Sequence, residues 1–161
     1  MTKPGKKSWR DKLHTANGLP RVEPMPANMR PYQGEGTLVI AAPLEVDALM
    51  RQVKQGQLTT IDAIRRALAK RHRATTACPM TTGMFANFAA HAAADEEAAG
   101  KLRVTPYWRT LKTGGELNPK FPGGLAVLRA RLEAEGHTVQ ARGKRLFVVD
   151  HESCLAELEA R

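Results

Sequence analysis

Residues 105–124 read TPYWRTLKTGGELNPKFPGG, and this stretch decides the fold that we expect for the chain. Pro106 has no backbone N–H and favours an extended residue before it, while Tyr107 and Trp108 favour a strand. The Gly114-Gly115 pair permits positive φ and predicts a tight turn after that strand. Gly123-Gly124 then opens a helix whose apolar positions are Leu125, Val127, Leu128 and Leu132. The stretch therefore predicts a strand, a loop and a helix that act as one unit.

Three further helices are predicted upstream of this unit. Pro43 begins the first at its N1 position, and Thr59 or Thr60 caps the second. After the turn ATTACPM, Thr81-Thr82 is expected to cap the third. Two helices joined by a short turn favour a helix-turn-helix. The alternative is an ordinary helical hairpin within a core.

The stretch at 105–136 resembles the active-site segment of the DNA alkylguanine alkyltransferases. The family's Pro-Cys-His-Arg-Val motif corresponds here to Pro106-Tyr107-Trp108-Arg109-Thr110. Its Gly-Gly-Leu and Glu-Gly motifs correspond to Gly123-Gly124-Leu125 and Glu135-Gly136. The reactive cysteine of the family falls on Tyr107 and its histidine on Trp108. The chain is therefore similar to the alkyltransferase-like branch, which keeps the DNA-binding fold and lacks the nucleophile, and the resemblance spans residues 43–140.

This resemblance implies a base pocket without a catalytic residue. A phenol has a pKa of about 10 and is protonated at neutral pH, so Tyr107 cannot replace a thiolate. The base pocket implied by the family consists of Tyr107, Trp108, Arg109 and Glu135. The alternative is that the two aromatic rings fill core volume. Cys78, which precedes a predicted helix N-terminus, is the one other candidate nucleophile, although a small buried cysteine is commoner.

The family's DNA contacts fall on the predicted helix-turn-helix. The tyrosine that rotates the base in the family aligns with Ile61, and the arginine that fills the base stack aligns with Met80, whose apolar side chain can wedge between bases. A basic helix face is expected to contact phosphates. The DNA-binding residues that we predict are Thr59, Thr60, Arg65, Arg66, Lys70, Met80, Thr81, Thr82, Gly83 and Asn87.

Composition narrows the class of protein further. The 161 residues carry a formal net charge of +9, which is typical of proteins that bind nucleic acid. Two cysteines argue against a disulfide scaffold and favour a reduced, cytoplasmic setting. No apolar run has the roughly 20 residues of a membrane span. The cysteine and histidine spacings match no zinc pattern, so we expect no metal and no cofactor.

We therefore expect a mainly α fold with a small amount of β structure: a winged helix-turn-helix domain of the alkyltransferase type with a basic arm. Residues 1–36, rich in proline, glycine and basic residues, are expected to be extended or disordered, with Trp9 and Tyr32 as possible anchors. Residues 37–150 form the domain, with a hairpin flanking Arg142-Gly143-Lys144. Residues 151–161 are expected to form a short helix.

The function expected from the sequence is non-enzymatic recognition of alkylated or otherwise altered guanine in double-stranded DNA, as part of DNA repair. We expect a cytoplasmic monomer that joins the nucleoid when bound to DNA and cooperates with other repair proteins. The alternatives are a methyltransferase that uses Cys78 and a winged-helix regulator or interaction module.

Overall fold

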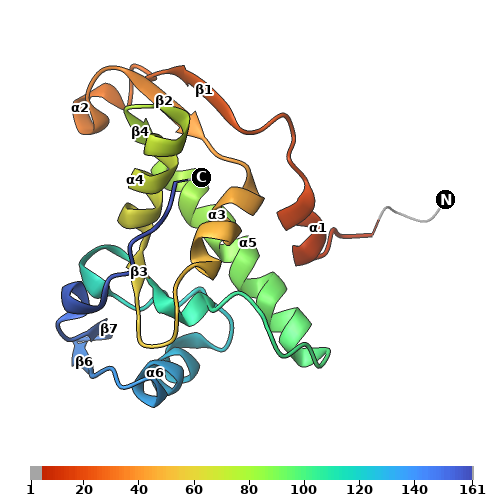
Figure 1. Ribbon diagram of the computed structural model, residues 1–161, viewed down its shortest axis with the longest axis vertical. Helices are drawn as coiled ribbons and strands as arrows, with labels where there is room; N and C mark the ends of the chain where they lie inside the picture. Colours follow the sequence, from red (N-terminus) through yellow and green to blue (C-terminus); the bar gives the residue numbers. More distant parts are fainter. Residues whose placement is uncertain (1–4, 161) are drawn as a thin grey trace.

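Three helices form the centre of the protein, for which a computed structural model describes residues 5–160 (Figure 1). They are α3 (Pro43–Arg51), α4 (Ile61–His72) and the long α5 (Pro79–Ala98). α5 packs against both of the others, and small alanine side chains on it let the helices approach closely. The core between them contains Val46, Met50, Ile64, Leu68, Phe85, Ala86, Ala89 and Ala90.

Residues close to the helix N-terminus determine where two of the three helices begin. Pro43 is the first residue of α3, as predicted, and the Thr60 hydroxyl accepts a hydrogen bond from the Ala63 N–H at the start of α4 (3.1 Å). The predicted cap of α5 at Thr81-Thr82 is wrong, because the helix already begins at Pro79. Proline is well suited to the first helical position. The Thr82 hydroxyl instead donates to the Cys78 carbonyl one turn back (2.7 Å).

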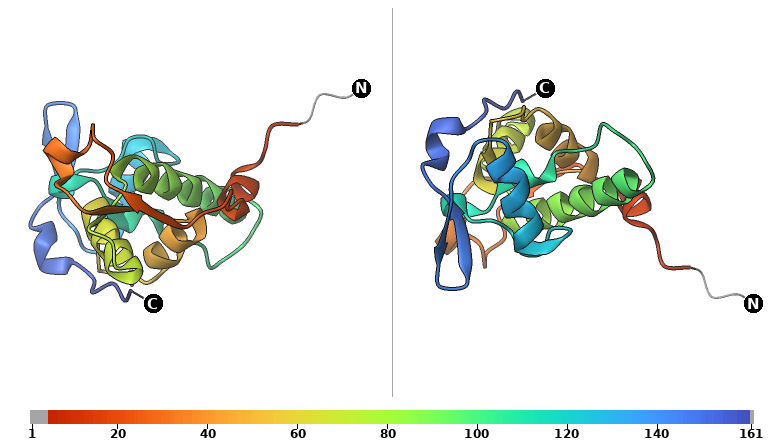
Figure 2. Two further views of the ribbon diagram at one scale, coloured as in Figure 1. Left: turned by 90° about the horizontal axis from the view of Figure 1, so that it is seen from above. Right: turned by 90° about the horizontal axis from the view of Figure 1, so that it is seen from below.

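The N-terminal segment is ordered where the structure describes it, which corrects the expectation of an extended or disordered arm. It contains α1 (Trp9–His14), β1 (Arg21–Pro24) and α2 (Arg30–Gln33). β1 pairs antiparallel with β2 (Thr37–Ile40), which pairs parallel with β4 (Thr76–Ala77). α1 lies against α5 in all three views (Figures 1 and 2). Residues 1–4 of the predicted arm lie outside the described residues.

The arm is ordered because it carries a helix signal and an anchor. The Ser8 hydroxyl accepts from the Asp11 N–H (3.1 Å), and the Asp11 carboxylate accepts in turn from the Ser8 N–H (3.4 Å). This reciprocal pair starts α1. Trp9 anchors the helix on α5, as predicted for this residue. The other predicted anchor, Tyr32, is 85% exposed and anchors nothing.

The 105–124 stretch forms a turn, a very short strand and a loop. Tyr107–Arg109 is a single 3₁₀ turn instead of the predicted strand, and only Thr110–Leu111 (β5) is extended, parallel to β3 (Thr59–Thr60). The glycine turn is confirmed, because Gly114 and Gly115 have φ values of 79° and 87°. The predicted helix and hairpin follow as α6 (Gly124–Ala134), β6 (Val139–Arg142) and β7 (Arg145–Val148).

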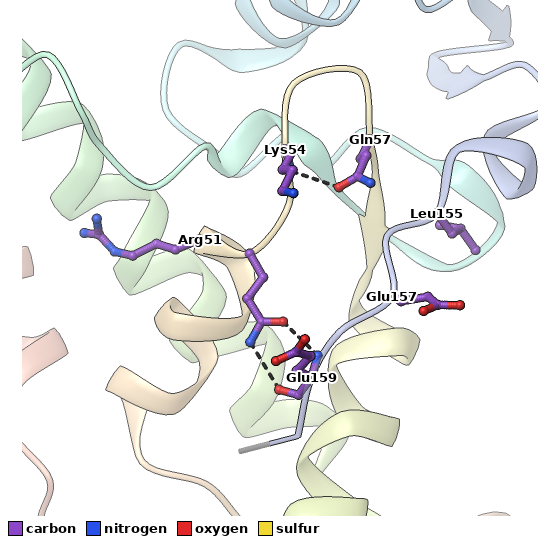
Figure 3. Close-up of a pocket in the computed structure, with 7 residues that line it drawn as sticks. Arg51, Lys54, Gln57, Leu155, Glu157 and Glu159 are labelled. Carbon is purple, nitrogen blue, oxygen red and sulfur yellow. Dashed lines mark hydrogen bonds between the residues drawn. The ribbon is translucent and has the colours of Figure 1, made fainter.

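The C-terminal segment is not the predicted helix. After one 3₁₀ turn (His151–Cys154) the chain is extended. Leu58 donates its N–H to the Cys154 carbonyl and accepts from the Ala156 N–H, both at 2.8 Å. The Gln52 side chain bonds both the N–H and the carbonyl of Glu159 (dashed lines in Figure 3). These main-chain partners hold the segment extended and outweigh its local helix propensity. Residue 161 lies outside the described part of the chain.

No helix between residues 5 and 160 is long and apolar enough to cross a bilayer. Within the same range, no group of three or more His, Cys, Asp or Glu side chains is placed to hold a metal ion.

A buried carboxylate ties α3 to the start of the 105–124 stretch. Asp47 accepts hydrogen bonds from the Thr105 hydroxyl (2.5 Å) and from Arg51 Nε (2.8 Å). We predict that Thr105→Val lowers the free energy of unfolding by about 2 kcal/mol, because it removes a hydrogen bond to a buried charge. Urea unfolding measures the change. Thr113→Val, which removes an exposed hydroxyl–carboxylate bond to Asp62, should cost clearly less, and equal losses would contradict the prediction.

Candidate nucleic-acid interface

Tyr107 lies in the core, which corrects its expected place at the floor of a base pocket. Its side chain is 2% exposed and packs edge-on against Trp108 and Phe121, with ring centroids 5.4 and 6.1 Å away. Within residues 5–160 the phenol hydroxyl makes no hydrogen bond to another residue, and its oxygen is not one of the fully buried polar atoms. Burial raises the pKa of Tyr107, and the nearby Arg131 guanidinium only partly opposes this rise. The phenol is therefore neutral at physiological pH and is no nucleophile.

The other three residues of the expected base pocket form a structural network. The Glu135 carboxylate accepts from Trp108 Nε1 (2.5 Å), from Arg109 Nε (2.8 Å) and from the Gly56 N–H (3.1 Å). Arg109 also donates to the Val53 carbonyl (2.8 Å). These bonds occupy the polar groups that would have contacted a base. The four residues predicted to form one pocket are thus close in space but do not converge on one cavity.

The electrostatics of this network favour an ionised carboxylate. Burial alone raises the pKa of Glu135, but the hydrogen bonds from Arg109, Trp108 and the Gly56 N–H outweigh burial, so the pKa lies below its ordinary value. Trp108 and Arg109 line one side of a hollow of about 780 Å³, together with Arg51, Lys54 and the exposed Leu102. Tyr107 does not contribute to that wall.

Several residues predicted to contact DNA are buried or engaged within the protein. Thr59 and Thr60 are buried in the β3–β5 pair, and Thr82 is buried on α5. Arg65 donates to the Ala77 carbonyl (3.0 Å) and to side chains of α2 and β4, so it holds the turn between α4 and α5 together. None of these four side chains is placed to bind a phosphate.

Arg66 and Lys70 are exposed on α4, as the basic face predicted. Both side chains line a hollow of about 230 Å³. Its other wall consists of Ala156 and Leu158 of the C-terminal segment. The same segment bounds a larger hollow of about 640 Å³ beside the loop that follows α3 (Figure 3). Arg51 points away from the C-terminal segment in this view. Any phosphate contact of Arg66 or Lys70 would therefore lie beside the C-terminal segment.

Three predicted residues do meet at one hollow. Met80, Gly83 and Asn87 of α5 line a cavity of about 440 Å³ that faces the loop preceding α6. Residues three or four positions apart on a helix share a face, which explains why these three positions lie together. We call this cavity the α5–loop hollow. Its other lining residues, which the sequence reasoning missed, are Met84, Lys112, Asn118, Pro119 and Lys120.

The chemistry of the α5–loop hollow combines apolar surface with positive charge. Met80 is 80% exposed and Met84 is also exposed, although both are large apolar side chains. Lys112 and Lys120 bring two cations from the facing loop; Lys112 Nζ lies 3.8 Å from Glu116, and Lys120 has no ion pair within residues 5–160. Asn87 adds an amide whose Oδ1 is buried without a hydrogen-bond partner. Such a surface suits a ligand with flat apolar groups and anionic oxygens.

A signal for some of the missed residues was present in the sequence. Met84 lies four residues after Met80, and one helix turn of spacing predicts that the two share a face. The lysines lie at the two ends of the glycine-turn loop, and only the tertiary fold brings them to α5. Thr81 is half-buried at the start of α5 and does not line the hollow.

Cys78 offers no sign of activation. It precedes Pro79 at the N-terminus of α5 and is half-buried. Its thiol has no hydrogen bond or ion pair to a base or cation in the described part of the chain. A helix N-terminus alone does not make a reactive thiol.

Comparison with known proteins adds one likeness of fold. No family model matches this chain, and no curated protein sequence matches it. The crystal structure of S. pombe Atl1 in complex with damaged DNA containing O6-carboxymethylguanine is similar over 71% of this chain and 94% of that chain. The two sequences are 13% identical over the match, and the TM-score is 0.49.

The buried position of Tyr107 leads to a prediction about stability. Tyr107→Phe removes a hydroxyl that bonds to no other described residue, so we expect the free energy of unfolding to stay within about 0.5 kcal/mol of that of the wild type. Tyr107→Ala leaves a cavity and should cost about 3–4 kcal/mol of unfolding free energy. Urea unfolding measures both values. A Phe variant that loses as much stability as the Ala variant would contradict the packing role of the ring.

The Glu135 network generates a prediction of pH dependence. A carboxyl group whose folded pKa is depressed adds stability above its unfolded pKa, near 4.3, and loses it as pH falls through the folded pKa. Glu135→Gln should therefore lower stability by about 2 kcal/mol at neutral pH. The difference in stability between the variant and the wild type should shrink as the pH falls below about 4. Glu133→Gln, an exposed site on the same helix, is the control, and thermal unfolding across pH measures the difference.

Proposed function

We propose that this protein binds double-stranded DNA at the α5–loop hollow and recognises altered guanine without transferring the alkyl group. The observation that carries the proposal is that Met80, Gly83 and Asn87, predicted from the sequence to meet DNA, lie opposite Lys112 and Lys120. The alkyltransferase-like sequence frame and the net charge of +9 support the same conclusion. Its biological role would be to mark lesions for other DNA-repair proteins.

Each part of the hollow would make a different kind of contact. The two lysines would neutralise phosphates and release counterions. Met80 would insert its exposed apolar end between base steps, as wedge residues of minor-groove binders do. The β6–β7 hairpin, with Arg142 and Lys144 at its tip, would serve as the wing beside the duplex.

The absence of an activated nucleophile in the described residues supports binding without chemistry. Tyr107 is a buried neutral phenol, and Trp108 stands where the family's proton relay would be. The Cys78 thiol makes no hydrogen bond or ion pair within residues 5–160. We therefore infer a protein that binds DNA and releases the altered base unchanged.

Binding is tested by fluorescence anisotropy with two labelled duplexes that differ only in one O6-methylguanine, at several salt concentrations. We expect the wild type to bind both and to prefer the altered duplex. Lys112→Gln and Lys120→Gln should each weaken binding to both duplexes and reduce the salt slope by about one. Lys101→Gln, which removes a cation paired with Glu96 away from the hollow, should change little.

Met80→Ala tests the wedge within the same assay. We expect it to reduce the preference for the altered duplex several-fold while leaving the salt slope unchanged, because the side chain is apolar. Leu102→Ala is a matched control, since Leu102 is 98% exposed but lies outside the hollow. A wild type that binds neither duplex at low salt would overturn the proposal, and a methyl adduct on Cys78 in mass spectrometry would favour the enzymatic alternative.

A further inference from the structure

His91 continues the row of α5 residues that lines the α5–loop hollow. Met80, Met84, Asn87 and His91 follow one another at intervals of four, three and four, which places them on one helix face. The first three line the hollow, and His91 lies one helix turn beyond Asn87 on α5. The Nε2 atom of His91 lies 3.0 Å from the carbonyl oxygen of Lys120. The histidine thus joins the helix directly to the loop that forms the opposite wall.

The same ring is covered by the N-terminal arm. Trp9 of α1 stacks on His91 with centroids 4.5 Å apart and planes 23° apart. Lys12 Nζ lies 4.3 Å from the centre of the Trp9 ring, and Leu13 is buried in the core. Figure 2 shows α1 lying against α5 in both views. One face of the imidazole is therefore held by the arm, while its Nε2 edge is directed to the loop.

The loop has its own internal bonds that set its shape. The Lys120 N–H donates to Asn118 Oδ1 (3.0 Å), and the Phe121 N–H donates to the Asn118 carbonyl (3.1 Å). Phe121 is buried next to Tyr107. Asn118, Pro119 and Lys120 therefore form a compact turn, and the bond from His91 fixes how far that turn stands from α5.

We propose that His91 is a positioning residue that sets the width of the α5–loop hollow, and that α1 of the arm holds His91 in place. The expected effect of His91 on the discrimination between altered and unaltered duplexes rests on the proposed function. A carbonyl can only accept a hydrogen bond, so Nε2 must carry the proton. The arm thereby contributes to recognition by holding His91 in place, although it does not line the hollow.

Three variants separate the contacts of the ring. His91→Phe keeps an aromatic ring for Trp9 to stack on but removes the donor. His91→Gln restores an N–H donor without the ring, and Trp9→Leu removes the stacking partner. We expect His91→Phe to reduce the preference for the O6-methylguanine duplex by about fivefold, the effect of one net hydrogen bond. His91→Gln should recover part of that preference, and Trp9→Leu should lose part of it.

Two further measurements do not depend on DNA. Hydrogen exchange followed by mass spectrometry should show faster exchange of the peptide covering residues 118–122 in His91→Phe than in the wild type or in Lys101→Gln. Long-range ¹H–¹⁵N correlation spectra of the wild type should show the proton of the neutral His91 ring on Nε2. Wild-type exchange of this peptide in His91→Phe, or a neutral ring protonated on Nδ1, overturns the inference.

These measurements also keep the two proposals apart. If the wild type binds no DNA, the proposed function fails, while the exchange rates and the histidine spectrum still decide whether His91 positions the loop. If the wild type discriminates between the duplexes and His91→Phe discriminates equally well, the positioning role fails and the proposed function stands.

Discussion

The carboxylate of Glu135, which lies at the C-terminal end of α6, accepts hydrogen bonds from two segments that are far from it in the sequence: the loop after α3 and the 3₁₀ turn at Tyr107–Arg109. Its side chain is almost fully buried, and a buried carboxylate is tolerated only when its oxygens are satisfied. The turn that resembles a reactive centre must therefore keep Trp108 and Arg109 directed at Glu135. The indole N–H of Trp108 and the Nε of Arg109 are thereby used within the protein, although both side chains still line the hollow of about 780 Å³.

This constraint determines where the candidate site lies. With Trp108 and Arg109 bound to Glu135, the Tyr107 ring turns toward Phe121 and becomes part of the core. The chain then leaves the junction through β5 and the glycine turn, and it places Lys112 and Lys120 opposite the first half of α5. The same fold that removes Tyr107 from the surface thus creates the α5–loop hollow. In it Lys112 and Lys120, which the family resemblance did not single out, face Met80 and Asn87, which were predicted to contact DNA.

Sequence reasoning succeeded where the deciding contacts are local. The start of α3 at Pro43, the cap at Thr60 and the β6–β7 hairpin depend on residues within a few positions of one another. It failed where a distant partner decides: the C-terminal segment is extended because of Leu58 and Gln52, and Arg65 is engaged by residues of α2 and β4. Tyr107 was expected in a pocket because the family resemblance implies that position, and only the packing of its ring against Phe121 shows that it belongs to the core.

The form of the hollow bears on how an altered base would be recognised there. A base that is fully extruded needs an enclosed pocket, and Tyr107, which was expected to form the floor of such a pocket, is packed in the core instead. A wedge such as Met80 requires only partial unstacking, which costs a few kcal/mol per step and less where pairing is already weakened. Selectivity would then come mainly from the reduced cost of deforming a damaged duplex, and little from hydrogen bonds to the base edge. A surface with exposed methionines, two lysines and two asparagine amides is suited to that form of recognition, and it needs no nucleophile.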